Sequence, residues 1–269
     1  MAVTHLIVGA GNMGGALLSG WLERGALGPR NVAILDPTPG TEAVFAIERG
    51  ARHLSGPEDI PASISTVLMA VKPQMFASLA GPIADALPDG ALVVSIMAGI
   101  DTGALAKRFP AAHIVRAMPN TPASIGRGVT AYVAASDLDE ALIERATTLL
   151  SASGSVLRVD SDDKINAVTA ISGSGPAYVF HLVEALEAAG RTLGLDAQTA
   201  ATLARETVTG ASALLDASER TPTELREAVT SPNGTTQAAL NELMSEHGLV
   251  PLMRRAARAA MDRSRELSR

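Results

Sequence analysis

The 269-residue chain contains no cysteine, which excludes both a disulfide framework and a thiolate nucleophile. Its five histidines are too scattered to form a metal-ligand pattern, so no metal site is expected. The apolar runs are broken well before the roughly 18 residues that a membrane-spanning helix needs, and no basic leader precedes the first of them. These absences favour a cytoplasmic protein whose chemistry comes from other residue types.

No block of Lys and Arg interrupts the first half, and the net charge is −6, so there is little to attract a polyanion. Several arginines do occur within 254–269, but Asp262 and Glu266 are interleaved with them at helical spacing. This pattern is typical of a solvated helix face. We therefore expect neither nucleic acid nor a membrane as a partner.

The chain is long enough for two domains, and its 47% apolar residues can fill their cores. Up to about residue 160, short β-rich runs alternate with helix-length stretches such as 13–24, 41–50, 74–87 and 101–108. Continuous apolar strands separated by helices predict a mostly parallel, doubly wound sheet. We therefore expect a Rossmann-type α/β domain over residues 1–161. Its strand candidates are 4–11, 31–36, 65–71, 91–99, 112–119 and 128–134.

Strand signals stop near residue 162, and Ala, Leu, Glu and Arg then recur every three or four residues. Asp196, Thr221 and Asn233 are plausible N-caps. The pattern predicts an all-helical second domain over residues 162–269. The expected helices cover 162–172, 176–193, 197–217, 222–230, 234–246 and 249–267.

The segment "GAGNMGGAL" places Gly9, Gly11 and Gly14 in G-x-G-x-x-G spacing between a strand and a helix, which is a specific signal for dinucleotide binding. The glycines permit the tight turn, the approach of a pyrophosphate, and close packing of helix on strand. A purely structural glycine turn is the alternative. The expected cofactor-binding residues are Gly9, Gly11, Asn12, Met13, Gly14, Asp36, Val71, Lys72, Pro73, Ala98, Gly99 and Asn120.

Three further loops lie where such a cofactor would run: "AVKPQ" (70–74), "SIMAGI" (95–100) and "RAMPNTP" (116–122). Lys72 would approach phosphate or ribose, or else be a solvated lysine at a strand end. Asn120 lies between two prolines on a rigid polar ledge near the expected nicotinamide. An ordinary rigid connection is the alternative for this last loop.

Two segments interrupt the helical half, "AISGSGPAYVF" (170–180) and "SPNGTTQAALNEL" (231–243). In the first, Pro176 suits the first turn of a new helix, although close helix packing alone would also explain the glycines. In the second, a helix restarts behind Pro232, so the amides of Gly234, Thr235 and Thr236 are unpaired donors. A substrate carboxylate fits there.

The blocks "GAGNMG", "AVKPQ", "RAMPNTP", "SGSGPAYVF" and "LREAVTSPNGTT" together resemble the pyrroline-5-carboxylate reductase family, in its order and over nearly the whole length. The family usually has Pro-Gly-Gly where this chain has Pro232-Asn233-Gly234. Asn tolerates left-handed backbone conformations, so the loop is expected to survive the change.

The resemblance implies hydride transfer from NADH or NADPH to Δ1-pyrroline-5-carboxylate, giving L-proline in the final step of its biosynthesis. It also implies a helical domain that interlocks two chains, with each active site shared between them and dimers commonly assembling further. Thr236 would hydrogen-bond the ring nitrogen, either as a proton donor or only to orient the ring. The expected substrate-binding residues are Ser231, Asn233, Gly234, Thr235 and Thr236.

Asp36 ends the second predicted strand, 22 residues after Gly14, where a carboxylate typically accepts hydrogen bonds from the ribose of NAD. No Arg or Lys occurs from Asn31 to Ile47, so the sequence leans toward NADH, which we expect to be used at least as well as NADPH. The alternative is that Asp36 caps the Asp-Pro turn and faces away from the ribose.

Two other functions fit less well. A β-hydroxyacid dehydrogenase would need a lysine and an asparagine four residues apart on one helix face, whereas Lys164 and Asn166 are two apart and point in different directions. A non-catalytic dinucleotide-binding protein would not need an ordered acceptor loop.

Overall fold

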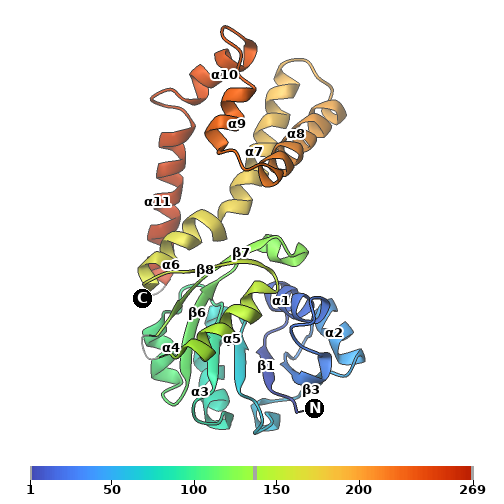
Figure 1. Cartoon of the computed structure of the whole chain (residues 1–269), viewed down its shortest axis with the longest axis vertical. Helices are drawn as coiled ribbons and strands as arrows, with labels where there is room; N and C mark the ends of the chain where they lie inside the picture. The colour runs from blue at the N-terminus through green and yellow to red at the C-terminus, as the bar shows by residue number, and fades with distance from the viewer. Residues whose placement is uncertain (1, 136–137, 268–269) are drawn as a thin grey trace. The chain divides into compact units, whose positions relative to one another are not determined.

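The computed structural model describes residues 2–135 and 138–267, which form two compact units. The sheet unit contains residues 2–135, 138–174 and 260–267, and the helical unit contains residues 175–259. The chain thus leaves the sheet unit once and returns to it near its end, as the colour course in Figure 1 shows. In this division residues 162–174 pack with the sheet, and the domain boundary at residue 161 stays a prediction.

An eight-stranded sheet with the order β3-β2-β1-β4-β5-β6-β7-β8 forms the centre of the sheet unit. Neighbouring strands are parallel except for β6 and β7. The winding direction reverses between β1 and β4, the position at which such sheets bind ligands. The strands are β1 (His5–Val8), β2 (Val32–Leu35), β3 (Arg52–Leu54), β4 (Thr66–Met69), β5 (Leu92–Ser95), β6 (His113–Met118), β7 (Gly128–Ala134) and β8 (Gly154–Arg158).

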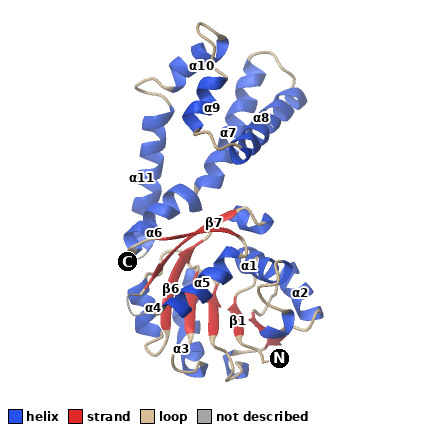
Figure 2. Cartoon of the chain, in the orientation of Figure 1, coloured by secondary structure: helices blue, strands red, loops and turns tan. Residues whose placement is uncertain are grey.

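Helices cover both faces of this sheet, which confirms the doubly wound fold (Figure 2). Because successive strand side chains point to opposite faces, Ile7 packs in one apolar cluster while Leu6 and Val8 pack in the other. The first cluster lies under α1 (Asn12–Glu23), α2 (Thr41–Glu48) and α5 (Glu140–Ser151). The second lies under α3 (Phe76–Ala86) and α4 (Thr102–Arg108). In the first, the indole N–H of Trp21 donates to the Leu149 carbonyl at 2.8 Å and ties α1 to α5.

Two strands and one α-helix of the sheet unit are not predicted from the sequence: β3, β8 and α5. β3 contains only three residues, two of them exposed, and β8 begins at a glycine and is mostly exposed, so neither has a continuous apolar run. Both are edge strands. The predicted strand at 128–134 is present as β7, but it runs antiparallel to β6 because the short connection between them leaves no room for a crossover helix.

The second half of the chain is helical, as predicted. The predicted interruption near residue 173 is a π-helical turn, η5, that joins α6 directly to α7. The elements are α6 (Asp162–Val168), η5 (Thr169–Gly173), α7 (Gly175–Thr192), α8 (Ala197–Ala217), α9 (Pro222–Ala228), α10 (Thr235–Leu243) and α11 (Leu249–Leu267).

Two of the three predicted N-caps are confirmed. The Asp196 carboxylate accepts from the Thr199 amide at 3.0 Å, and Thr221 forms a reciprocal capping box with Glu224. The prediction for Asn233 was wrong, because Gly234 is the N-cap of α10 and no side chain caps that helix. Asn233 instead adopts a left-handed conformation with φ 56°, which turns the chain just before the helix.

The helical unit has almost no buried core of its own. Only Ala200 and Ala204 of α8 are buried, while α7, α9 and α10 have no buried residue. Helices α7 and α8 do approach closely, since a Cβ on Gly190 would lie 3.3 Å from the Ala200 side chain. Large apolar side chains are left exposed along the unit, among them Val179, Phe180, Leu182, Leu186, Leu203, Leu214, Leu215, Val229, Leu243, Met244, Leu249, Val250 and Leu252.

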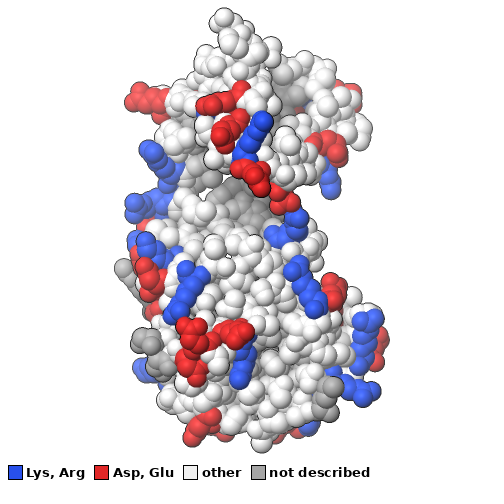
Figure 3. Space-filling view, in the orientation of Figure 1, with Lys and Arg blue, Asp and Glu red and all other residues white. Residues whose placement is uncertain are grey.

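Charged side chains of both signs are interspersed on the face that Figure 3 shows. No continuous basic surface appears in that view, in agreement with the low content of Lys and Arg. Within the described residues, no helix is both long and apolar enough to cross a membrane.

Candidate active site

The three motif glycines have three different surroundings at the turn from β1 to α1. Gly9 has φ 87°, and a Cβ on it would lie 2.8 Å from Val71 Cγ1. A Cβ on Gly14 would collide with the Gly9 carbonyl oxygen, whereas one on Gly11 would find no atom within 4 Å. The first and third glycines are therefore required by packing, and the second leaves open space directly in front of a helix N-terminus.

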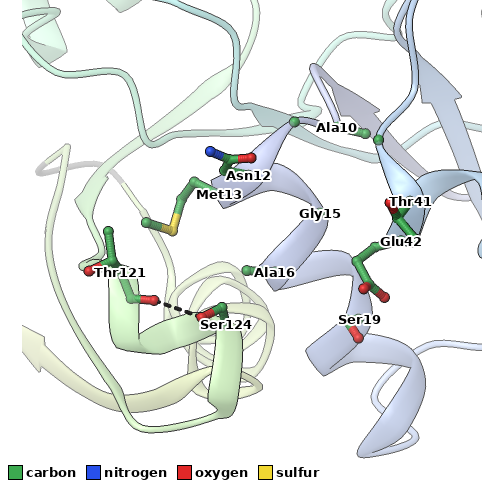
Figure 4. A pocket seen from close by; sticks show the side chains of 12 residues that line it. Ala10, Asn12, Met13, Gly15, Ala16, Ser19, Thr41, Glu42, Thr121 and Ser124 are labelled. Atoms are coloured by element: carbon green, nitrogen blue, oxygen red, sulfur yellow. Dashed lines mark hydrogen bonds between the residues drawn. The ribbon is translucent and has the colours of Figure 1, made fainter. Parts of the chain in front are cut away.

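A cavity of about 520 Å³ opens over this turn (Figure 4). It is bounded by the start of α1, the start of α2, and the 3-10 turn η4 (Thr121–Ile125) that follows β6. Figure 4 shows the Met13 side chain extending toward Thr121, and Glu42 extending toward Ser19. The lining residues are Ala10, Gly11, Asn12, Met13, Gly15, Ala16, Ser19, Gly40, Thr41, Glu42, Thr121 and Ser124.

This cavity fits the pyrophosphate of a dinucleotide. The first backbone hydrogen bond of α1 is from Gly15 to the Gly11 carbonyl, so the amides before Gly15 have no partner within the helix. Those amides and the helix dipole favour an anion at the place where Gly11 leaves space. Asn12 and Met13 line the same cavity. The predicted glycine, Asn12 and Met13 positions are thus brought together here.

Two hydrogen bonds fix the Asp36 carboxylate, one from the glycine turn and one from its own loop. One carboxylate oxygen accepts from the Ala10 amide at 2.6 Å and the other from the Thr38 amide at 2.8 Å. The Ala10 carbonyl in turn accepts from the Gly40 amide at 3.3 Å. Ala10 therefore binds both ends of the connection between β2 and α2, at Asp36 and at Gly40. Asp36 therefore makes the turn-capping contact considered above, and its carboxylate stays beside the dinucleotide motif.

The other two predicted loops lie at the same carboxyl edge of the sheet but do not line this cavity. Lys72 is exposed after β4, and Pro73 begins the short turn η3 (Pro73–Met75). After β5, Ala98 is exposed and Gly99 is buried with φ 77°. A Cβ on Gly99 would lie 2.7 Å from the Leu267 carbonyl oxygen, so the last turn of α11 presses against this loop.

Asn120, at the end of β6, is oriented by two hydrogen bonds. Its side-chain oxygen accepts from the Val129 amide at 2.9 Å, and its side-chain nitrogen lies 3.2 Å from the Ser172 hydroxyl in the π-helical turn. The predicted polar ledge therefore extends to a residue of the "SGSG" segment. The sequence predicts for that segment a break between helices or close helix packing, and not this contact.

A buried polar cluster behind this edge was not predicted. Arg116 is fully buried in β6 and pairs with Asp162 at 2.7 Å, and its other terminal nitrogen donates to Asn166 at 3.3 Å. Asp162 also accepts from the Thr102 hydroxyl at 2.6 Å, while Ser264 of α11 donates to Asn166 at 3.1 Å. The cluster ties together β6, α4, α6 and α11. Its sequence signal was an arginine within an otherwise mostly apolar strand.

The predicted substrate loop lies in the helical unit, between α9 and α10. The Gly234 amide donates to the Ser231 carbonyl at 3.0 Å, so the prediction that this amide is an unpaired donor was wrong. A Cβ on Gly234 would collide with the Ser231 hydroxyl. Ser231 therefore places its hydroxyl beside the N-terminus of α10. The first hydrogen bond across that terminus is from Ala238 to the Gly234 carbonyl, which leaves the amides of Thr235 and Thr236 without a partner in the helix.

Other chemistries find less support in the described residues. Across 2–135 and 138–267, no group of three or more His, Cys, Asp or Glu is placed to hold a metal ion. On α6, Lys164 is exposed while Asn166 is buried and bonded to Arg116 and Ser264. These two side chains do not form the lysine–asparagine pair of a β-hydroxyacid dehydrogenase.

Comparisons with known proteins match both halves of the chain. Residues 162–267 match the family model for pyrroline-5-carboxylate reductase dimerisation, and residues 5–99 match that for coenzyme F420-dependent NADP oxidoreductase. The pyrroline-5-carboxylate reductase of Pseudomonas aeruginosa is 38% identical, with 97% of this chain and 95% of that protein covered.

Solved structures agree. A pyrroline-5-carboxylate reductase from Coxiella burnetii has a TM-score of 0.90 and is 33% identical, with both chains covered completely. A pyrroline carboxylate reductase from Plasmodium falciparum, crystallised with NADP, has a TM-score of 0.83 at 24% identity over 99% of this chain and 98% of that one, which shows the fold. From its sequence and its fold, the chain belongs to the pyrroline-5-carboxylate reductase family.

Proposed function

We propose that this chain reduces Δ1-pyrroline-5-carboxylate to L-proline, the final step of proline biosynthesis. The observation that carries the proposal is that two helix N-termini suit two different anions. The N-terminus of α1 follows a glycine turn that leaves room for a pyrophosphate. The N-terminus of α10 follows Ser231 and begins at Gly234, with no side chain capping it. The first suits a dinucleotide and the second suits a small carboxylate. A reduced nicotinamide supplies the hydride when bound.

The loop between α9 and α10 is the proposed substrate site. Ser231 and the amides of Thr235 and Thr236 bind the carboxylate, Gly234 leaves room for it as the N-cap, and Asn233 provides the left-handed turn before these amides. The Pro-Asn-Gly sequence performs this turn in place of the family's usual Pro-Gly-Gly. The amide group of Asn233 also gives the loop a polar side chain that the usual glycine lacks.

Thr236 is the proposed contact to the imine nitrogen. Hydride attack on the neighbouring carbon is favourable only when that nitrogen is protonated or accepts a hydrogen bond. Residues 229–236 contain no titratable side chain, so this loop has no general acid of its own. We infer that Thr236 orients a ring protonated in solution, and that placing two bound molecules in register provides much of the acceleration.

The proposed cofactor is NADH, used at least as well as NADPH. Asp36 is fixed beside the glycine turn, and Glu42 lines the cavity, whereas no Lys or Arg does. A 2′-phosphate on the adenosine ribose would meet negative charge on the β2–α2 side without a compensating cation. Both oxygens of Asp36 already accept one hydrogen bond, and each has a second lone pair for a ribose hydroxyl.

The proposed partner is a second copy of this chain. The chain carries the family's dimerisation region, and the helical unit leaves its apolar faces exposed. We propose that these faces pack together in a homodimer, that each active site combines one chain's cofactor site with its partner's substrate loop, and that dimers assemble further. A cytoplasmic location remains a prediction.

A direct assay tests the proposal. Purified protein is mixed with Δ1-pyrroline-5-carboxylate and either NADH or NADPH, and loss of reduced cofactor is followed together with gain of proline. We expect equal molar amounts of cofactor oxidised and proline formed. Oxidation of the cofactor without proline, or no reaction with either cofactor in a protein that binds them, would exclude this function.

A further inference from the structure

The hydroxyl of Ser172 is held at the carboxyl edge of the sheet with its proton free to donate. The backbone amide of Val129 can only donate, so it fixes the side-chain oxygen of Asn120 on its own side. The side-chain nitrogen of Asn120 must then face Ser172, and it donates to the hydroxyl oxygen. Within residues 2–135 and 138–267, no acceptor is found for the single proton of Ser172.

The π-helical turn sets the position of this hydroxyl. Residues Thr169–Gly173 form one wider turn between α6 and α7, closed by the Ser174 amide on the Thr169 carbonyl at 2.8 Å. The turn lies against β6, since a Cβ on Gly173 would be in ordinary van der Waals contact with Met118, at 3.8 Å. Such single turns recur at functional sites because they redirect side chains without ending the helix.

Ser172 also lies next to the wall of the dinucleotide cavity. Its partner Asn120 is followed directly by η4, whose Thr121 and Ser124 line the cavity opposite Asn12 and Met13 (Figure 4). In a doubly wound sheet the pyrophosphate lies over the first strand and the nicotinamide extends along the carboxyl ends of the strands on the other side of the switch point. β6 is one of those strands.

We propose that Ser172 positions the nicotinamide ring by donating a hydrogen bond to its carboxamide oxygen, with Asn120 holding the hydroxyl in place. This assignment rests on the proposed function. The chain of donors runs from the Val129 amide through Asn120 to Ser172, and it ends in a donor that is polarised by the bonds before it. A carboxamide oxygen is a strong neutral acceptor that completes the chain.

Binding measurements with and without the nicotinamide separate this role from a structural one. Ser172→Ala is expected to raise the Kd of NADH about tenfold, the effect of losing one hydrogen bond. The Kd of ADP-ribose, which lacks the nicotinamide, is expected to stay within about twofold of its original value. Ser172→Thr keeps the hydroxyl and is expected to restore NADH binding. Ser174→Ala, on the same turn but without the Asn120 contact, is the matched control and is expected to bind both ligands normally.

Two further measurements test the direction of the hydrogen bond. Asn120→Asp still accepts from Val129 but also accepts the proton of Ser172, so it is expected to weaken NADH binding although Ser172 is present. In the acetylpyridine analogue of the oxidised cofactor, an acetyl group replaces the carboxamide. The analogue therefore keeps the carbonyl oxygen and lacks the amide NH₂. The Ser172→Ala penalty is expected to persist with this analogue, and its disappearance would overturn donation to the oxygen.

Three results would overturn the role of Ser172 but not the proposed function. The first is that Ser172→Ala raises the Kd of NADH and the Kd of ADP-ribose equally, and the second is that Ser174→Ala raises the Kd of NADH as much as Ser172→Ala does. The third is that Ser172→Ala leaves the Kd of NADH unchanged and raises the KM for the imine. Failure of the unmodified protein to bind NADH or NADPH would instead overturn the proposed function and this assignment with it.

Discussion

The sheet unit and the helical unit differ most in how they bury apolar side chains. The sheet unit has two continuous apolar clusters, one on each face, with large side chains such as Trp21 and Phe109 almost fully buried. The helical unit buries only two alanines, and Phe180 on α7 is 64% exposed. A region with its own core can fold and bind a ligand by itself, whereas one without a core needs another surface to cover it.

The proposed cofactor-binding and substrate-binding residues differ in the same way, since the first lie in the unit with a core and the second in the unit without one. The cofactor-side residues lie on loops fastened to a packed sheet, by contacts such as the bond from the Ala10 amide to Asp36. The substrate loop lies between short helices that have no buried residue. We therefore expect changes in the helical unit to affect turnover and assembly while leaving cofactor binding intact.

The largest expected effect comes from placing a charge in the exposed apolar face of α7. Phe180→Glu should prevent the proposed dimer and lower kcat/KM at least about a hundredfold, because a buried unpaired carboxylate is strongly unfavourable. NADH binding should persist. Light scattering, calorimetry and steady-state kinetics measure the three properties, and Glu184→Gln on the same helix is the control. If the Phe180→Glu protein were a fully active monomer of 27.6 kDa, the helical unit would not need a second chain to cover its apolar face.

Next in size is loss of the buried ion pair within the sheet unit. Arg116→Met leaves Asp162 without its buried partner, and we expect the free energy of unfolding to fall by about 3–5 kcal/mol. Arg265→Met removes an exposed pair with Asp163 and should cost about 1 kcal/mol or less. Denaturant unfolding of both variants provides the comparison. Equal losses would show that the buried cluster contributes no more than the exposed pair.

Thr236→Ala tests the substrate loop. We expect a decrease in kcat/KM of about ten- to a thousandfold, or roughly 1.4–4 kcal/mol of transition-state stabilisation, with unchanged cofactor affinity. Thr236→Ser keeps the hydroxyl and should retain most of the activity. Steady-state kinetics with varied imine and varied cofactor measures both effects, and unchanged turnover in a folded Thr236→Ala protein would rule out this role.

The pH dependence of stability should reveal a half-buried histidine in the sheet unit. Desolvation, reinforced by the positive charge of Arg145, lowers the pKa of His5 from 6.5 to about 4. The unfolded chain therefore takes up a proton between these two values while the folded chain does not. Folding should weaken as pH falls from about 6.5 to about 4, by at most about 3 kcal/mol.

A variant isolates this histidine from the carboxylates that titrate over the same range. His5→Gln cannot be protonated, so its stability should fall less steeply between pH 6.5 and pH 4 than that of the unmodified protein. Chemical unfolding at several pH values measures both curves. Parallel curves would mean that His5 titrates alike in the folded and unfolded chains.

The smallest expected effect concerns the choice of cofactor. Asp36→Ser should shift the ratio of catalytic efficiencies toward NADPH by about tenfold, which corresponds to relief of roughly 1.4 kcal/mol of repulsion. The same change removes the bonds to Ala10 and Thr38, so thermal stability should be measured alongside. A strong NADPH preference in the unmodified protein that the change leaves intact would show that Asp36 does not contact the ribose.

Most of the fold could be predicted because apolar periodicity is a local property. The apolar pattern of a long amphipathic helix or a fully buried strand can be recognised within a short stretch of sequence. The N-caps Asp196 and Thr221 can be recognised too, because each directly precedes the helix that it caps. The edge strands β3 and β8 lack such runs, since their residues meet solvent on at least one side. Their pairing depends on a neighbouring strand that is distant in sequence.

The candidate site divides in the same way. The glycine motif and the loop before α10 were visible in the sequence because the chemistry lies in consecutive residues. Gly234 rather than Asn233 caps α10 because the turn places Asn233 in the left-handed region, a choice that depends on backbone geometry. The bond from Asn120 to Ser172 joins residues 52 apart, which no local pattern specifies.

The sequence by itself determined the doubly wound sheet, the helical second half and the family, because these depend on periodicity and on short motifs. Only the tertiary structure decided which polar groups meet. Arg116 is stable in the interior only because Asp162 and Asn166 arrive from another element. Asp36 and Ser172 likewise acquire their orientation from partners in other elements, since a hydrogen bond requires a donor and an acceptor at the same point in space.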